Sequence, residues 1–300
     1  MSAKASEPLE RVDGRSQIDP KPKPKPKPKF KKRVGAKAAK AFERVDATNK
    51  NGALSQNGAT TFRAISARGN YLAQDRPDAS FASKELCRDF SQPSAHSLQK
   101  LKRLGRFYAG RPRLVYKYRF AQRPATHIDV FCDTDFARCT QTRRSTSGGC
   151  ALIGTACIKH WSKTQPTVTL SSGEAELVGL GQGIAQALGL RSLAADTNWP
   201  LQLNVHTDAT AAIGIAKRRG LGKVRHLHTT DLWVQETVRN GDVALHNVLG
   251  AENPADIFTK YLDRTIMEAA MKKFDLHYMP GRAKAAPDTM GLRSVTPSAQ

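Results

Sequence analysis

The sequence is poor in several features that particular classes of protein require. It has five cysteines in 300 residues and no Cys-x-x-Cys pair, which argues against a disulfide framework and against a structural zinc site. No run approaches roughly eighteen consecutive apolar residues, so we expect no membrane span. Residues 1–20 contain no apolar segment of the kind that a secretory signal needs. We therefore expect an intracellular protein, cytoplasmic or nuclear, that does not associate with membranes.

Acidic residues are also scarce, and this shortage is uneven along the chain. Asp and Glu total 26 against 48 Lys and Arg, which gives a net charge of +22. Residues 1–50 carry +9 and residues 51–125 carry +10, whereas residues 126–265 carry only +1. Such an excess favours a partner that bears many phosphates. The chain is thus expected to combine a basic N-terminal part with a nearly neutral domain.

Both ends of the chain are expected to lack a packed core. Residues 20–30 alternate Pro and Lys almost strictly, a pattern that favours polyproline II and cannot build a core. We predict a disordered Lys/Pro-rich tail over residues 1–57, acting either as an arm that meets nucleic acid or as a solvated linker. Residues 266–300 are expected to form a C-terminal tail.

Residues 58–125 are predicted to be mainly helical. Large apolar residues recur at helical intervals between residues 81 and 107 and are interrupted at Gln92 and Pro93. This indicates two helices separated by a turn, and a short strand is expected over residues 113–118. The polar faces carry basic residues that could contact a phosphate backbone or simply be solvated. They are Lys100, Lys102, Arg103, Arg106, Arg111 and Arg113.

From residue 126 onward the pattern alternates between strands and helices. Strands are predicted over residues 128–132, 150–153, 158–161, 201–205 and 243–248, and helices over 171–191, 209–217, 229–240 and 252–261. A turn-rich loop is predicted over residues 144–149. The fold class is therefore α/β, a mixed sheet with helices on both faces.

Acidic side chains fall where such a sheet would bring them together. Asp133 and Asp208 follow strands, and Asp256 lies in the last predicted helix. A further acid comes from the helix that begins near residue 171, where spacing does not choose between Glu174 and Glu176. An acid after a strand is often only a turn or cap residue. Converging carboxylates, however, require a compensating cation, and Mg²⁺ or Mn²⁺ suits oxygen ligands of this kind.

Three ordered blocks resemble one known family. They are residues 144–148 (RSTSG), residues 163–176 (KTQPTVTLSSGEAE) and residues 255–260 (ADIFTK). Together they resemble the ribonuclease H domain of copia-type retrotransposon Pol polyproteins, over about residues 126–265. The resemblance implies a ribonuclease H-like five-stranded mixed sheet.

The resemblance also implies the site. Ribonucleases H use four acids in the order Asp, Glu, Asp, Asp, which fall here on Asp133, Glu176, Asp208 and Asp256 as ligands of two Mg²⁺ ions, with Mn²⁺ as an alternative. Asp135 competes with Asp133 for the first position. The chain departs from the family at Arg138, which could lower metal affinity if it pointed inward.

Residues 58–125 are similar to the C-terminal end of the reverse transcriptase that precedes this domain, around residues 76–82 (RPDASFA). The Tyr-x-Asp-Asp motif of the polymerase has no counterpart, so we expect no DNA synthesis and interpret the chain as the end of a polyprotein or a gene derived from one.

The leading hypothesis is an endonuclease that cuts the RNA strand of RNA–DNA hybrids, with a reverse transcriptase as a further partner. The alternative is a non-catalytic nucleic-acid-binding remnant. A transposase or integrase on the same fold is disfavoured because the Glu comes second among the acids.

Overall fold

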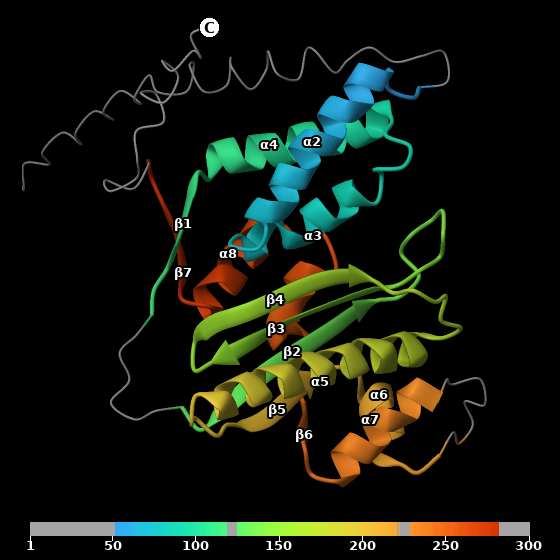
Figure 1. Ribbon diagram of the computed structural model, residues 1–300, viewed down its shortest axis with the longest axis vertical. Helices are drawn as coiled ribbons and strands as arrows, with labels where there is room; N and C mark the ends of the chain where they lie inside the picture. Colours follow the sequence, from blue (N-terminus) through green and yellow to red (C-terminus); the bar gives the residue numbers. More distant parts are fainter. Residues whose placement is uncertain (1–51, 119–124, 221, 223–228, 282–300) are drawn as a thin grey trace, which may run out of the picture.

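The computed structural model describes residues 52–118, 125–220, 222 and 229–281 (Figure 1). Apart from its last residues, the predicted Lys/Pro-rich tail lies outside these ranges. The predicted division at residues 57, 125 and 265 remains an expectation. No helix in the described ranges is both long and apolar enough to cross a bilayer.

The first part of the described chain is a three-helix unit. It consists of α2 (Gln56–Leu72), α3 (Pro77–Cys87) and α4 (Ala95–Gly110), followed by β1 (Arg113–Tyr116). Phe62, Leu86 and Leu101 are buried at its centre. The two predicted helices are confirmed as α3 and α4, and the predicted strand as β1. The sequence reasoning did not anticipate α2, whose N-terminus is capped by the Ser55 side chain.

The central feature is a five-stranded mixed sheet, as predicted (Figure 1). Its order is β4-β3-β2-β5-β6, with β2 antiparallel to β3 and parallel to β5. The strands are β2 (His127–Asp135), β3 (Thr146–Ile153), β4 (Ala156–Thr164), β5 (Gln202–Thr207) and β6 (Ala244–Asn247). The predicted hairpin at Gly154 is confirmed between β3 and β4, and Gly154 has a φ of +61°. The three strands that begin the domain therefore form the antiparallel half of the sheet.

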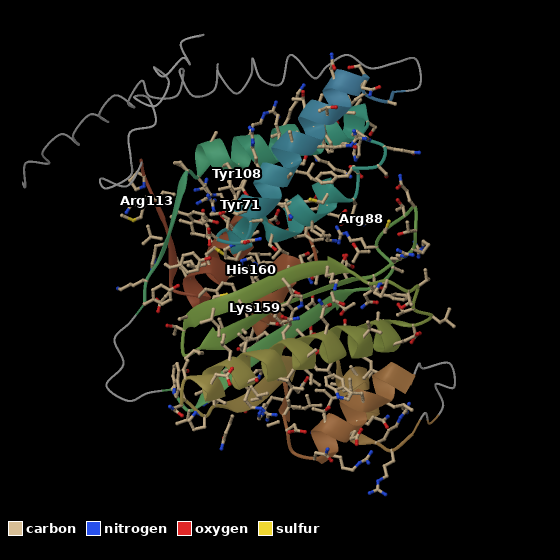
Figure 2. The ribbon with its side chains drawn as sticks, in the orientation of Figure 1. Tyr71, Arg88, Tyr108, Arg113, Lys159 and His160 are labelled. Atoms are coloured by element: carbon tan, nitrogen blue, oxygen red, sulfur yellow. The ribbon has the colours of Figure 1, made fainter. Side chains whose placement is uncertain are left out.

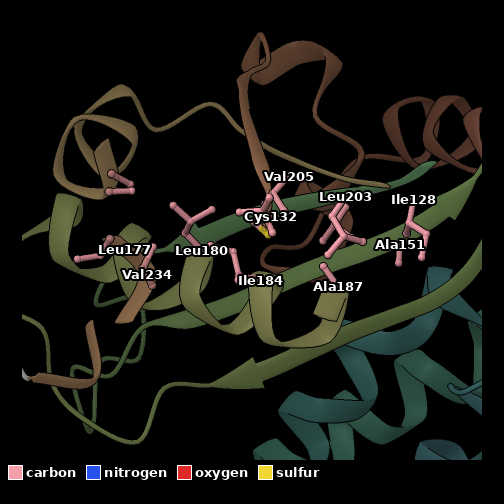
Figure 3. Packing of buried hydrophobic residues seen from close by; sticks show 14 of the residues in the cluster. Ile128, Cys132, Ala151, Leu177, Leu180, Ile184, Ala187, Leu203, Val205 and Val234 are labelled. Atoms are coloured by element: carbon pink, nitrogen blue, oxygen red, sulfur yellow. The ribbon is translucent and has the colours of Figure 1, made fainter. Parts of the chain in front are cut away.

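One face of the sheet is covered by α5 (Ser172–Asp196), with α6 (Thr210–Lys217) and α7 (Thr229–Arg239) packed beside it. The predicted apolar stripe of α5 is buried, and Figure 3 shows Leu180 and Ile184 packed near Cys132. A Cβ atom on Gly183 would collide with the Cys132 sulfur, and one on Gly179 would collide with the Thr134 hydroxyl. The glycines therefore let α5 lie directly against β2.

The opposite face is covered by the C-terminal part of the chain. Two 3₁₀ turns, η1 (Gly250–Glu252) and η2 (Pro254–Phe258), lead into α8 (Arg264–Lys273) and β7 (Leu276–Met279), which pairs with β1. The helix predicted over residues 252–261 is therefore wrong. The Asn253 side chain accepts a hydrogen bond from the Ala255 amide and donates one to the Cys132 carbonyl, which fixes this segment on β2 as a short turn.

Two further expectations are corrected by the C-terminal packing. Residues 266–279, expected in a tail, form most of α8 and β7, and Phe274 and Leu276 are buried beside Phe258. Residues 146–149, expected in a loop, belong to β3. A Cβ on Gly148 would lie 2.7 Å from the Phe258 side chain, so this glycine serves close packing rather than a turn.

The three-helix unit is joined to the sheet by polar contacts as well as packing. Figure 2 shows His160 on β4 facing the helices, and its Nε2 lies 3.0 Å from the Gln74 carbonyl. The Lys84 ammonium donates to the Thr146 hydroxyl at 2.9 Å. On the other side, the Tyr278 hydroxyl donates to Asp78 at 2.9 Å. These contacts fix α3 relative to β3, β4 and β7.

Candidate active site

Strands β2 and β5 place the first two acids at one edge of the sheet. The parallel register pairs Phe131 with His206, so Asp133 and Asp208 stand level with each other two residues farther along. The prediction that Asp133 follows its strand needs a correction, because β2 continues to Asp135 through its pairing with β3. Asp208 directly follows β5. A Cβ on Gly250 would lie 3.0 Å from an Asp208 carboxylate oxygen, so the loop before η2 passes close to this acid.

Asp133 is the most deeply buried of the predicted ligands, with 6% of its surface exposed. Burial, together with the negative charges of Asp256 and Asp208, raises its pKa from 3.8 to about 6. The Thr259 hydroxyl donates a hydrogen bond to its Oδ2 atom and opposes this rise. Asp133 is therefore near the third and fourth acids of the predicted set.

Glu176 lies early in α5 and belongs to the same group. Burial raises its pKa from 4.5 to about 8, with further contributions from the charges of Asp133 and Asp208. The other candidate, Glu174, has a different task. Its Oε2 atom accepts a hydrogen bond from the Leu170 amide at 2.7 Å, and its own amide donates to the Ser171 hydroxyl. Glu174 thus stabilises the start of α5 while Glu176 faces the aspartates.

Asp256 comes from η2 and is bound to a lysine that the sequence reasoning overlooked. The Lys260 ammonium lies 2.7 Å from the Asp256 Oδ1 atom. Burial would lower the pKa of Lys260, but the hydrogen bond to Asp256 and the charges of Asp133 and Asp135 raise it. Thr259 and Lys260 both lie in the ADIFTK block, which was the available signal. One short segment thus supplies an acid, a hydroxyl and a cation to the site.

The alternative first ligand, Asp135, is engaged elsewhere. Its Oδ2 atom accepts a hydrogen bond from Arg138 at 3.1 Å, and the Arg138 side chain is 52% exposed. The arginine is therefore paired with the competitor of Asp133, in a partly solvated position. This geometry favours Asp133 as the ligand, which remains a prediction.

Comparisons with known proteins identify relatives in sequence and in structure. No protein-family model matches the chain. The chain is 35% identical, over 125 residues, to an uncharacterized mitochondrial protein of Arabidopsis thaliana, covering 42% of this chain and 51% of that protein. Over 224 residues, 74% of this chain, it is 26% identical to the retrovirus-related Pol polyprotein from transposon RE1 of the same plant, of which it covers 15%. These relatives confirm the predicted resemblance to copia-type retrotransposon Pol polyproteins.

The chain spans about half the length of the first relative and a small part of the second. Among solved structures it is similar to the N-terminal RNase H domain of rv2228c from Mycobacterium tuberculosis, with 15% identity and a TM-score of 0.33 over 49% of this chain and 98% of that one. The described sheet, mixed and five-stranded with helices on both faces, confirms the predicted α/β fold class and sheet composition.

The site consists of carboxylates, which suit a divalent cation, but their side chains do not surround one common point. Within the described ranges, no group of three or more His, Cys, Asp or Glu side chains is placed so that it could hold a metal ion. The pKa values of Asp133 and Glu176 are nevertheless raised, first by burial and then by the negative charges of neighbouring acids. Carboxylate oxygens are the ligands that Mg²⁺ and Mn²⁺ prefer.

Proposed function

We propose that residues 126–265 hydrolyse the RNA strand of RNA–DNA hybrids as part of a retrotransposon-derived polyprotein. The observation that carries the proposal is electrostatic. Asp133 and Glu176, from a strand and a helix far apart in sequence, have pKa values raised by burial and by the negative charges of neighbouring acids, Asp208 among them. A fold holds like charges together at such a cost mainly where a cation or a reaction requires them.

Asp133, Glu176, Asp208 and Asp256 would hold two Mg²⁺ ions, or Mn²⁺. Such ions, when bound, supply an activated water and stabilise the leaving oxygen of a phosphodiester. The chain's own groups then have defined tasks. The Thr259 hydroxyl orients the Asp133 carboxylate, and Lys260 neutralises Asp256 until that carboxylate is needed as a ligand.

Selectivity for a hybrid would come from contacts to the 2′-hydroxyls of one strand and from the sugar shape of the other. The relatives of this chain are polyproteins, so a reverse transcriptase that makes the hybrid is the natural partner. The hybrid would then pass from that polymerase to residues 126–265.

The test is cleavage of a labelled RNA–DNA hybrid, with duplex DNA and duplex RNA alongside, in the presence of Mg²⁺. We expect cleavage of the RNA strand of the hybrid only, and loss of cleavage in Asp208→Asn. The matched control is Asp263→Asn, an exposed acid before α8 whose side chain makes no capping hydrogen bond. Equal cleavage by wild type and Asp208→Asn would refute the proposal.

A second candidate function is non-catalytic binding of nucleic acid. The ion pair between Lys260 and Asp256 favours it. In the nuclease proposal Asp256 is a metal ligand, whereas here its carboxylate is already bound to the Lys260 ammonium. Hybrid binding that is equal in Mg²⁺ and in EDTA, with no cleavage product, would select this candidate.

A further inference from the structure

A cleft of about 800 Å³ lies between α4 and the segment that runs from η2 into α8. On the α4 side, His96, Lys100, Arg103, Phe107 and Gly110 line it. These positions recur at intervals of four and three residues, so they form one face of the helix. The cleft is therefore built by a continuous helical face and not by isolated side chains.

The walls of this α4–α8 cleft are strongly basic. Six Lys and Arg residues line it against two acids, Asp78 and Glu268. Both acids are already neutralised, because Asp78 pairs with Arg76 at 2.8 Å and Glu268 pairs with two of the arginines of the wall. The basic residues are Lys100, Arg103, Arg106, Arg111, Lys260 and Arg264.

Two arginines of the wall are left without compensation. Arg103 and Arg106 are exposed, and neither makes an ion pair within the described ranges. They lie three residues apart on α4, so their guanidinium groups are spaced along one side of the helix. A guanidinium group binds phosphate through paired hydrogen bonds. This part of the cleft therefore complements a phosphate-bearing chain.

Aromatic side chains stand beside these cations. The Tyr261 ring is 57% exposed and packs edge-on against Phe81, with ring centroids 4.8 Å apart. Both rings line the cleft, as does Phe107. Tyr261 is the exposed member of this group, and a groove that combines cations with an exposed aromatic side chain is typical of sites that follow a nucleic-acid strand.

The cleft adjoins the acid site at Lys260. Lys260 lines the cleft, and its ammonium also pairs with Asp256 at 2.7 Å. Tyr261 is the next residue. A polymer whose phosphodiester lay at the acids could thus continue along α4 without leaving the protein surface.

We propose that the α4–α8 cleft binds the phosphate backbone of a nucleic acid that extends from the acid site. The identity of this nucleic acid as the substrate rests on the proposed function, whereas its binding in the cleft does not require cleavage. The three-helix unit, which is similar to the end of a reverse transcriptase, would then be a part of the nuclease's own binding surface.

The test measures binding without catalysis. Full-length protein is titrated into a fluorescein-labelled RNA–DNA hybrid in EDTA, and the dissociation constant is followed by anisotropy at several KCl concentrations. The test variant is Arg103→Glu with Arg106→Glu. The control is Lys159→Glu with Arg239→Glu, two exposed residues of β4 and α7 outside the cleft, which lower the net charge by the same amount.

We expect the cleft variant to bind about 50-fold more weakly at about 0.1 M salt, because two lost phosphate contacts lower the salt slope by about 1.8. The control should retain most of the affinity and the slope. Thermal melting checks that both variants fold. An unchanged slope and affinity in the cleft variant would overturn the proposal.

The outcomes separate this inference from the proposed function. If wild type fails to cut the hybrid but the cleft variant still loses binding, the cleft assignment stands and the nuclease proposal fails. If wild type cuts the hybrid while the cleft variant binds and cuts as well as the control, the nuclease proposal stands and the cleft assignment fails.

Discussion

Replacing Glu176 with Gln should stabilise the metal-free protein at high pH. The Glu176 carboxyl is held in a buried position near Asp133 and Asp208, and its pKa is raised from 4.5 to about 8. A raised pKa means that the folded state binds the proton more tightly than the unfolded state does. The stabilisation is complete below about pH 4.5 and is lost as the pH rises through about 8. A glutamine at this position carries no charge at any pH, so the variant does not lose this stability as the pH rises.

The magnitude follows from the displacement of the pKa. A pKa that moves from 4.5 to about 8 amounts to about 5 kcal/mol, at about 1.4 kcal/mol for each tenfold change in the dissociation constant. Because water can enter the site and neighbouring charges can rearrange, the change in free energy of unfolding is smaller than this figure. We expect the variant to exceed wild type by about 2 kcal/mol in free energy of unfolding at pH 9, and by little at pH 5.

Urea denaturation in EDTA at pH 5, 7 and 9 measures the effect. The control is Glu174→Gln, which weakens the hydrogen bond from the Leu170 amide and should cost about 1 kcal/mol at all three pH values. Added Mn²⁺ should stabilise wild type through mass action and have less effect on Glu176→Gln. If Glu176→Gln proved no more stable than wild type at pH 9, the acids would not be in electrostatic contact, and the site would have to be abandoned.

Three further outcomes follow from the same geometry. Lys260→Met should raise the affinity for Mn²⁺ in calorimetry, because its ammonium no longer competes for Asp256; unchanged affinity would show that the lysine is no competitor. Mn²⁺ affinity should increase from pH 6 to pH 9 as the two acids of raised pKa release their protons; a flat profile would contradict those pKa values. Gly183→Ala should cost about 1–3 kcal/mol in urea denaturation because its Cβ meets the Cys132 sulfur. Gly189→Ala, in the same helix with open space around it, should instead gain up to about 1 kcal/mol; equal effects of the two changes would refute the close packing of α5 on β2.

The elements that could be predicted from the sequence are those whose apolar residues follow a regular local spacing and are also buried in the structure. The stripe of α5 and the hairpin at Gly154 are of this kind, because each depends on residues within one segment. The strand character of residues 146–149 could not be predicted in this way. Gly148 and Gly149 are typical turn formers. Only the tertiary contacts explain why these positions must be small: Phe258, far along the chain, lies against Gly148, and Trp161 on the neighbouring strand lies against Gly149.

The choice between Glu174 and Glu176 shows a similar limit. Both flank the apolar stripe of α5, so helical geometry alone left them equal. The structure distinguishes them through contacts outside the helix, since Glu174 binds the Leu170 amide while Glu176 experiences the charges of two aspartates on neighbouring strands. A preference that depends on tertiary electrostatics carries no signal in local spacing.

The segment over η2 explains why a short motif carries so much of the site. In a 3₁₀ turn, side chains at i and i+3 lie on the same side. Asp256 and Thr259 are so placed, and the Thr259 hydroxyl contacts both the Asp256 carbonyl and the Asp133 carboxylate. The intervening Ile257 and Phe258 point into the core and are almost fully buried. The 3₁₀ turn thus places Ile257 and Phe258 in the core and Asp256 and Thr259 at the site. The predicted α-helix would place these two pairs of side chains at other angles around its axis.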